Sequence, residues 1–184
     1  MNWNDENLIK ILKQGGVVIM PTDTIYGMLG RAEDEKTVER IYKIRKRSRE
    51  KPCIILIGDI KELVKFSISL SREQEQALEK YWPGPMSVIL DCPEEKFTYL
   101  HRGTNTLAFR LPSLKGLRDL LLKTGPLLAP SANPEGLPPA ENIEQAQKYF
   151  GDAVDLYING RIMTNKASRV IKLHKDGTTS IIRE

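Results

Sequence analysis

Three short strand-like runs, each closed by a proline, constrain the fold of this sequence most. The runs cover residues 17–20, 107–111 and 127–129, with prolines at positions 21, 112 and 130. The first run is continuously apolar, which is typical of a strand covered on both faces. Because Pro21 cannot donate a ladder hydrogen bond, we expect residues 22–27 to form a loop at the end of that strand. Ligand groups tend to gather at such strand ends in open α/β sheets.

Helical segments alternate with these runs and with further strands. Apolar periodicity, caps and breakers predict helices that begin at Asn4 and Asp34, after Asp59 and Ser71, over residues 117–122, and from a capping box of Asn142 and Gln145 to Phe150. Further strands are predicted over residues 54–57, 86–90, 154–158, 170–173 and 180–183, with a tight turn at Asp176-Gly177. This order favours an α/β sheet wrapped by helices, with an antiparallel part near the C-terminus.

Length and charge narrow the class of protein. A chain of 184 residues that is 40% hydrophobic and 28% charged can bury one core but is short for two ordinary domains, so we expect a single domain over residues 1–184. Lysine and arginine outnumber aspartate and glutamate by 28 to 24, which mildly favours anionic partners such as nucleotides or RNA. The sequence shows neither a signal-peptide pattern nor an apolar run long enough for a bilayer. We therefore expect a soluble cytoplasmic protein without a membrane partner.

The cysteines and histidines do not indicate a metal site. Cys53 and Cys92 stand far apart and outside any paired metal or redox spacing, so we interpret them as reduced core residues. His101 and His174 are too few and too separated for a metal cluster, and we assign them no catalytic role.

A run of cations is the first candidate for chemistry. Six basic residues fall within nine positions and only Glu50 opposes them; they are Lys43, Arg45, Lys46, Arg47, Arg49 and Lys51. Such a run concentrates positive charge and can form an anion site. It is also what the solvated end of a helix carries to complement its macrodipole, and the segment taken alone favours this second interpretation.

Two polar loops are the other candidates. Residues 21–27, Pro-Thr-Asp-Thr-Ile-Tyr-Gly, place hydroxyls, a carboxylate and a phenol directly after a buried strand, as a pocket for a small zwitterion would require. Residues 129–134 again pass from a short strand into a loop, and Ser131 and Asn133 share one side if that segment is extended. Both segments are also compatible with ordinary turns, in which such side chains satisfy the local backbone.

Together these segments resemble, in content and order, the YrdC/TsaC family of threonylcarbamoyl-AMP synthases. The matching motifs are residues 22–27, residues 45–47, the Trp-Pro-Gly-Pro turn at 82–85 and Ser131-Ala132-Asn133. The family signatures are Lys-x-Arg, here Arg45-Lys46-Arg47, and Ser-x-Asn. Arg45 thus replaces the usual lysine, which keeps the charge but changes its geometry. Other departures from residues common in the family are Ser48, Ser87 and Arg169.

The resemblance implies a twisted mixed sheet with an electropositive concave cleft, and a defined reaction. L-threonine, bicarbonate and ATP would give threonylcarbamoyl-AMP and pyrophosphate, with Mg²⁺ carried by ATP and no metal site of the protein's own. Since the sequence ends at Glu184, we expect the short bacterial type, whose product passes to partner proteins that modify tRNA. Direct binding of tRNA or other RNA is left open.

By matching motif positions, the resemblance also implies roles for particular residues. The catalytic cations would be Arg45 and Arg47. The pocket for threonine and bicarbonate would contain Thr22, Thr24, Tyr26, Arg110 and Ser131. The nucleotide and its phosphates would be bound by Arg47, Lys51, Thr106, Asn133, Ser168 and Arg183.

Two alternatives accompany this interpretation. The first is an RNA-binding module of the same fold without adenylation activity, in which phosphate contacts spread over a surface and affinity depends strongly on salt. The Ser131 and Asn133 pairing favours the pocket, because relatives of doubtful activity often lack it. The second is a related carbamoyl-adenylate activity, which normally occurs in a domain of much longer chains.

Overall fold

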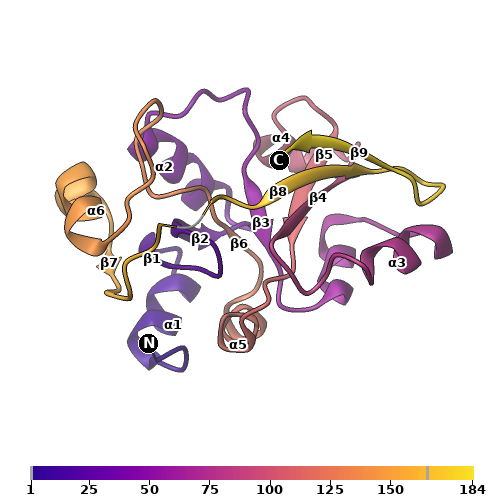
Figure 1. The fold of residues 1–184 in the computed structure, drawn as a ribbon. Coiled ribbons are helices and arrows are strands. Elements are labelled where there is room, and N and C mark those ends of the chain that lie inside the picture. The colour runs from indigo at the N-terminus through magenta and orange to yellow at the C-terminus, as the bar shows by residue number, and fades with distance from the viewer. Residues whose placement is uncertain (1, 165) are drawn as a thin grey trace.

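One nine-stranded mixed sheet organises the chain in a computed structural model that describes residues 2–164 and 166–184. Its strands follow the order β7-β1-β2-β6-β3-β5-β4-β8-β9 (Figure 1). They are β1 (Val18–Pro21), β2 (Tyr26–Arg31), β3 (Ile54–Leu56), β4 (Met86–Asp91), β5 (Thr106–Arg110), β6 (Leu127–Leu128), β7 (Leu156–Tyr157), β8 (Arg169–Leu173) and β9 (Thr179–Arg183).

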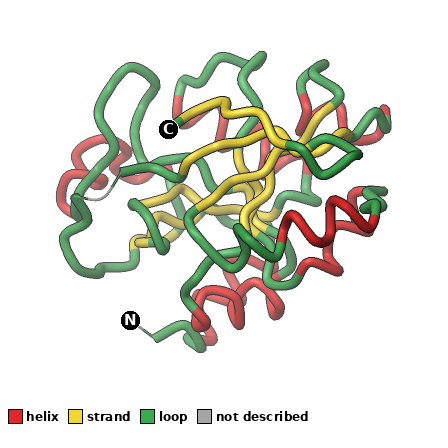
Figure 2. Tube along the Cα trace, turned by 45° about the vertical axis from the view of Figure 1, so that its right-hand side comes forward, coloured by secondary structure: helices red, strands yellow, loops and turns green. Residues whose placement is uncertain are grey.

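Helices surround the strands, as Figure 2 shows. The α-helices are α1 (Glu6–Lys13), α2 (Glu35–Arg45), α3 (Arg72–Leu78), α4 (Thr98–His101), α5 (Lys115–Thr124) and α6 (Ile143–Phe150). Short 3₁₀ helices are η1 (Ile60–Phe66), η2 (Glu95–Phe97) and η3 (Gly151–Ala153). The predicted α/β class and the sheet wrapped by helices are confirmed. Among the described residues, no helix has the length and apolar character needed to cross a membrane.

The sheet combines parallel and antiparallel pairs. β1 pairs antiparallel with β2 and parallel with β7, while β3 pairs parallel with β5 and antiparallel with β6. β4 lies between β5, which is antiparallel to it, and β8, which is parallel. The final pair, β8 with β9, is antiparallel, so the predicted antiparallel part near the C-terminus is confirmed.

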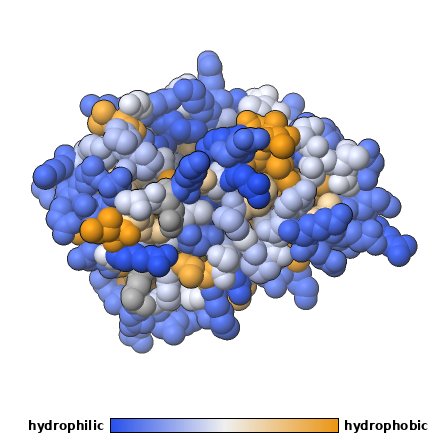
Figure 3. Space-filling model, viewed as in Figure 1, coloured by the Kyte–Doolittle hydropathy of each residue, from blue (hydrophilic) through white to orange (hydrophobic). Residues whose placement is uncertain are grey.

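The core lies on both faces of the sheet, because alternate residues of a strand point to opposite sides. Val18 and Met20 of β1 join a cluster that contains Leu8 and Leu12 of α1 and leucines of α5. Ile19 joins the larger cluster on the other face, with residues of α2, α3 and α6. All four residues of β1 are buried, which confirms the prediction of a strand covered on both faces. On the face seen in Figure 3, apolar side chains form small, separate patches between hydrophilic ones.

Several predicted helix starts are confirmed, but the predicted cap of α1 and the predicted capping box of α6 are wrong in detail. Asp34 caps α2, and Ser71 with Gln74 forms a complete capping box at α3. The cap of α1 is Asp5 and not Asn4, because the Asp5 carboxylate accepts from the backbone N–H of Leu8 at 2.8 Å. At α6 the predicted capping box is only half formed: Asn142 accepts from the backbone of Gln145, whose own side chain accepts from the backbone of Glu141 instead. The segment after Asp59 is the 3₁₀ helix η1.

Strand β2 was not predicted, and the expected loop over residues 22–27 is shorter because β2 begins at Tyr26. Two glycines conceal this strand in the sequence, since glycine is unfavourable in strand interiors. Gly30 has a packing reason: a Cβ there would lie 2.5 Å from Cγ2 of Thr37 and 3.0 Å from Cδ1 of Ile41, both on α2. The missing side chain thus lets α2 approach the sheet closely.

An ion pair joins α2 to the segment before β7. The carboxylate of Asp155 accepts from Arg40 Nη1 at 2.5 Å and from the backbone N–H of Val17 at 2.7 Å. Burial raises the pKa of this carboxyl, but the hydrogen bonds from Arg40 and Val17 outweigh burial and hold the pKa below its usual value of 3.8. A carboxyl with a lowered pKa in the folded state stabilises that state above its unfolded pKa, and the stabilisation is lost as pH falls through the folded pKa.

We therefore expect Asp155→Asn to lower the free energy of unfolding at pH 7 by up to about 1 kcal/mol, the upper end for exposed ion pairs. Below about pH 4 the difference from wild type should shrink, because the carboxyl of the unfolded wild-type chain takes up a proton first and the folded carboxyl follows at lower pH. Urea denaturation over a series of pH values measures this. Asp119→Asn, which removes an exposed carboxylate paired with Lys115 on α5, is the matched control. A gap between wild type and Asp155→Asn that stays constant down to pH 2 would contradict the role assigned to the pair.

Candidate functional site

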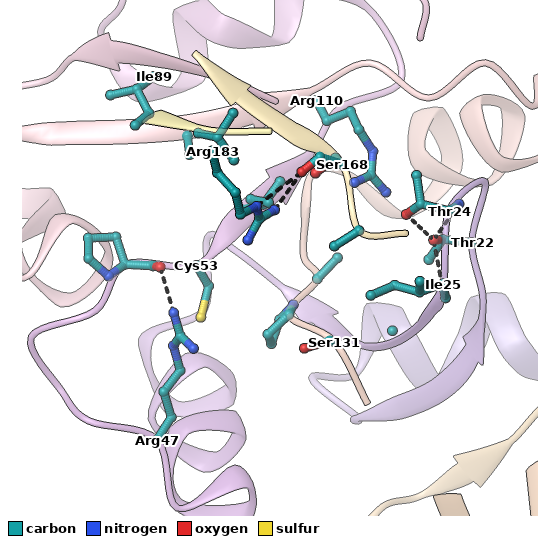
Figure 4. Close-up of a pocket in the computed structure, with 18 of the residues that line it drawn as sticks. Thr22, Thr24, Ile25, Arg47, Cys53, Ile89, Arg110, Ser131, Ser168 and Arg183 are labelled. Atoms are coloured by element: carbon teal, nitrogen blue, oxygen red, sulfur yellow. Dashed lines mark hydrogen bonds between the residues drawn. The ribbon is translucent and has the colours of Figure 1, made fainter. Parts of the chain in front are cut away.

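A cavity of about 320 Å³ lies where the β1–β2 loop, the end of α2 and the strands β3, β5 and β8 converge. Figure 4 shows Arg47 and Cys53 on one side of the cavity and Thr22, Thr24 and Arg110 on the other. Its charged lining residues are all arginines: Arg45, Arg47, Arg110 and Arg183. It also has hydroxyl-bearing lining residues, which are Thr22, Thr24, Thr104, Thr106, Ser131 and Ser168.

Most of the predicted site residues therefore meet in one place although they come from distant parts of the chain. The structure brings together Thr22, Thr24, Arg45, Arg47, Thr106, Arg110, Ser131, Ser168 and Arg183. Three predicted residues, Tyr26, Lys51 and Asn133, are not among the lining residues. Each of these three makes a specific contact behind the lining or beside it, described below.

Backbone pairing sets the Ser131 segment beside the β1–β2 hairpin. Ser131 forms an isolated antiparallel bridge with Gly27. On either side of that bridge, Met28 donates its N–H to the carbonyl of Pro130, and Ala132 donates to the carbonyl of Tyr26, both at 2.9 Å. The predicted hydroxyl-rich loop and the Ser-x-Asn segment are thus neighbours because an extra stretch of ladder joins them.

Arg45 is the centre of the site's hydrogen bonding. Its side chain is buried, with 2% of the residue exposed, and its Nε donates to the carbonyl of Asn133 at 3.0 Å. Its Nη2 donates to Asn133 Oδ1 and Ser131 Oγ, both at 3.2 Å, while Nη1 is buried and has no hydrogen-bond partner among the described residues. Burial lowers the pKa of Arg45 to about 10, which leaves the group charged at neutral pH. The two signature motifs therefore bind each other directly.

Asn133 consequently acts behind the lining. Its amide nitrogen donates to the carbonyls of Pro134 and Leu137, at 3.0 and 2.7 Å, and this directs its oxygen toward Arg45. A backbone hydrogen bond also joins this loop to the end of α2, because Glu135 donates its N–H to the carbonyl of Arg45 at 2.9 Å.

Lys51 lies outside the cavity because Glu135 holds it. Its Nζ pairs with Glu135 Oε1 at 2.5 Å, and the other carboxylate oxygen accepts from the backbone N–H of Ser48. The hydrogen bond from Lys51, followed by that from Ser48, lowers the pKa of the Glu135 carboxyl. Arg47 instead lines the cavity, and its guanidinium donates only to the carbonyls of Lys51 and Pro52, at 3.0 and 3.1 Å.

Tyr26 supports the site from the core. Its ring is fully buried, and its hydroxyl accepts from the backbone N–H of Gly160 at 3.0 Å. Burial raises the pKa of this phenol, so the hydroxyl stays protonated at neutral pH. The neighbouring Thr22 does reach the cavity: its hydroxyl donates to the carbonyl of Ile25 at 2.7 Å and lies 3.3 Å from that of Thr24.

Ser168 and Arg183 form the wall contributed by β8 and β9. The Ser168 hydroxyl is 2.9 Å from that of Ser87, so its hydrogen-bonding capacity is partly used inside the protein. Its carbonyl accepts from Arg183 Nε at 3.2 Å and Nη2 at 2.6 Å. Burial, followed by the nearby charge of Arg47, lowers the pKa of Arg183. Arg47 and Arg183, which are far apart in the sequence, thus line the same cavity.

Some residues of the site could not be found from the sequence alone. Asp23 pairs with Arg110 behind the cavity, and Glu135 ties the two signature segments together. Cys53, expected to be a buried core residue, is buried as predicted but also lines the cavity. The sequence offered one hint for each: Asp23 lies inside the motif at residues 21–27, and Glu135 directly follows the segment at residues 129–134. In the part of the chain that the structure describes, no group of three or more histidine, cysteine, aspartate or glutamate side chains is arranged to hold a metal.

Comparison with known proteins agrees with this geometry. A family model named Sua5_yciO_yrdC, described as "Telomere recombination", matches residues 10–184. The chain belongs to the Sua5/YciO/YrdC family. The resemblance drawn from the motifs is thereby confirmed.

Relatives and structures within the family are similar over most of this chain. A threonylcarbamoyl-AMP synthase of Pyrococcus abyssi is 30% identical over 173 residues, covering 93% of this chain and 51% of the relative. One from Marinobacter nauticus is 32% identical over 164 residues, with 86% and 85% covered. A crystal structure of Pyrococcus abyssi Sua5 complexed with L-threonine has a TM-score of 0.85 and 28% identity, covering 94% of this chain and 52% of that one. The chain therefore spans about half the length of the Pyrococcus relative.

The hydrogen bonds of Arg45 predict a cost for restoring the family's lysine. A lysine cannot reproduce the planar fork that reaches Asn133 and Ser131 together. We expect Arg45→Lys to lower the free energy of unfolding by about 1.5–3 kcal/mol, the range for hydrogen bonds to charged groups. Chemical denaturation measures this, with Lys43→Arg on the exposed side of α2 as the matched control. Unchanged stability of Arg45→Lys would show that the fork contributes little.

Proposed function

We propose that this chain is a threonylcarbamoyl-AMP synthase, which joins L-threonine, bicarbonate and ATP and releases pyrophosphate. The observation that carries the proposal is one cavity that has the hydroxyls of the β1–β2 loop and Arg110 at one side and Arg47 at the other. Relatives that bear this enzyme name, and a family structure complexed with L-threonine, support the same assignment.

The amino acid fits the side of the cavity formed by Thr22, Thr24 and Arg110. Hydroxyl groups can accept from an ammonium or donate to a carboxylate, and a guanidinium binds a carboxylate through paired N–H groups. Ser131, which lies beside the same hairpin, would complete the pocket. The triphosphate fits the other side, where the hydrogen bonds that Arg47 and Arg183 make to described residues go to neutral carbonyls.

The reaction needs no covalent intermediate with the protein. The neutral amine of threonine adds to carbon dioxide and loses a proton, or adds to bicarbonate and releases water, and either route gives a carbamate. An oxygen of the carbamate then attacks the α-phosphorus of ATP. The bond from that phosphorus to the bridging oxygen breaks, and pyrophosphate leaves with the electron pair. Catalysis then consists of alignment and of fixed positive charge where phosphate charge develops. Arg45 lines the cavity and adds to this fixed positive charge.

Mg²⁺ would enter with ATP and would be held by phosphate oxygens, because the residues that line the cavity include no carboxylate. When bound, the ion supplies further neutralisation of phosphate charge. The product would serve the threonylcarbamoyladenosine modification of tRNA through partner proteins of the cytoplasm.

We expect pyrophosphate release to require ATP, bicarbonate and L-threonine together. A coupled assay with each component omitted in turn measures this. Pyrophosphate release without threonine would contradict the proposed substrate. Salt-sensitive RNA binding without any turnover would favour instead the RNA-binding module.

Arg47→Ala should raise the KM for ATP by about tenfold or more, as expected for loss of one charge-assisted phosphate contact, and should change threonine binding less. Arg49→Ala is the matched control, since Arg49 is close in sequence but has a side chain that is 82% exposed. Equal losses for ATP and threonine in Arg47→Ala would contradict the role assigned to Arg47.

A further inference from the structure

Asp23 is a buried carboxylate behind the wall of the cavity. Its side chain is 1% exposed and accepts at Oδ1 from Arg110 Nη2 at 2.8 Å, while that of Arg110 is 5% exposed. The other oxygen, Oδ2, is 3.4 Å from the backbone N–H of Ser113. A buried charge is costly unless it is paired, so each member of this ion pair makes the burial of the other tolerable.

The pair uses only part of the Arg110 guanidinium. Nη2 donates to Asp23, whereas Nε is buried and has no hydrogen-bond partner in the part of the chain that the structure describes. Arg110 lines the cavity on the side of Thr22 and Thr24, as Figure 4 shows, and Asp23 stands between these two threonines in the sequence. One carboxylate therefore ties the hydroxyl-bearing loop to strand β5, which carries the arginine.

The four arginines of the cavity differ in their partners. Within residues 2–164 and 166–184, only Arg110 forms an ion pair; Arg45, Arg47 and Arg183 donate to carbonyl, amide or hydroxyl oxygens. A fixed negative charge next to Arg110 repels a polyanion more strongly than a single carboxylate, because Coulomb repulsion grows with the charge of the ligand. Glu135 acts electrostatically on Arg45 and Arg47, but its carboxylate is hydrogen-bonded to Lys51, whose positive charge offsets it.

We propose that Asp23 is a positioning residue that reserves Arg110 for the single carboxylate of the amino acid and directs the polyphosphate to the remaining arginines. The inference rests on the proposed function, because it assigns the two substrates to different cations of one cavity. Burial lowers the pKa of Arg110, and the charge of Asp23 and its hydrogen bond oppose that lowering. Asp23 itself need not touch the substrate.

Titrations with L-threonine and, separately, with the non-hydrolysable α,β-methylene-ATP test this. Asp23→Asn keeps the shape and an accepting oxygen but removes the charge. We expect it to weaken threonine binding by about tenfold or more, while the ATP analogue binds as in wild type or more tightly, since one repulsive charge is gone. Asp119→Asn is the matched control. Equal weakening for both ligands would indicate a merely structural role, and unchanged threonine affinity would also overturn the inference.

A double-mutant cycle distinguishes an effect of Asp23 through Arg110 from a general structural defect. If Asp23 acts through Arg110, then Asp23→Asn should cause little further loss of threonine affinity in an Arg110→Gln background. Additive losses would show that Asp23 acts by another route. Asp23→Glu, which keeps the charge but displaces it, should weaken threonine binding and leave the ATP analogue unaffected; this variant decides the question should Asp23→Asn not fold.

Nuclear magnetic resonance of the arginine side chains separates failure of this inference from failure of the proposed function. Restricted rotation of the Arg110 guanidinium, observed in wild type and lost in Asp23→Asn, would support the positioning role without any substrate present. Rotation that is the same in both proteins would overturn it. Wild-type protein that neither binds threonine nor releases pyrophosphate would contradict the proposed function, whatever this spectrum shows.

Discussion

The buried guanidinium of Arg45 is the contact on which the rest of the site depends. It lies at the last turn of α2 and donates to both the backbone and the side chain of Asn133, and to the hydroxyl of Ser131. A charged group with so little exposure must be satisfied by its neighbours, which fixes the path of the loop after β6. The position of Ser131 in the cavity and the close approach of Glu135 to α2 both follow from that path.

The arginines of the cavity show how similar side chains acquire different properties from their surroundings. Arg47 and Arg183 interact with carbonyl oxygens, which orient a guanidinium without cancelling its charge. Arg110 has a carboxylate partner, and Arg45 is enclosed by an amide and a hydroxyl. Under the proposed function, these different partners would keep the amino acid and the polyphosphate in separate parts of the cavity.

Local patterns in the sequence were sufficient for most of the fold. Prolines after apolar runs marked the ends of β1, β5 and β6, and the cap residues Asp34 and Ser71 marked the starts of their helices. Strand β2 escaped prediction because Gly27 and Gly30 have no side chains that would complete an apolar pattern. For the site, the resemblance to the family motifs predicted most of the residues that the structure brings together in one cavity. Lys51 and Asn133 lie outside the cavity lining because of partners that only the fold brings close. Lys51 pairs with Glu135, and Asn133 accepts a hydrogen bond from Arg45. No local sequence pattern shows either contact.

The glycine at position 30 shows how a site can depend on an absent side chain. Thr37 and Ile41 occupy the space that a methyl group on Gly30 would need, so the depth of α2 against the sheet is set by that vacancy. Any larger residue would displace the helix, and with it the guanidinium at its C-terminal end. Substitutions at Gly30 would therefore impair activity as strongly as substitutions of residues that line the cavity. The cause would be indirect, because a larger residue at position 30 would shift α2, which carries Arg45 at its C-terminal end.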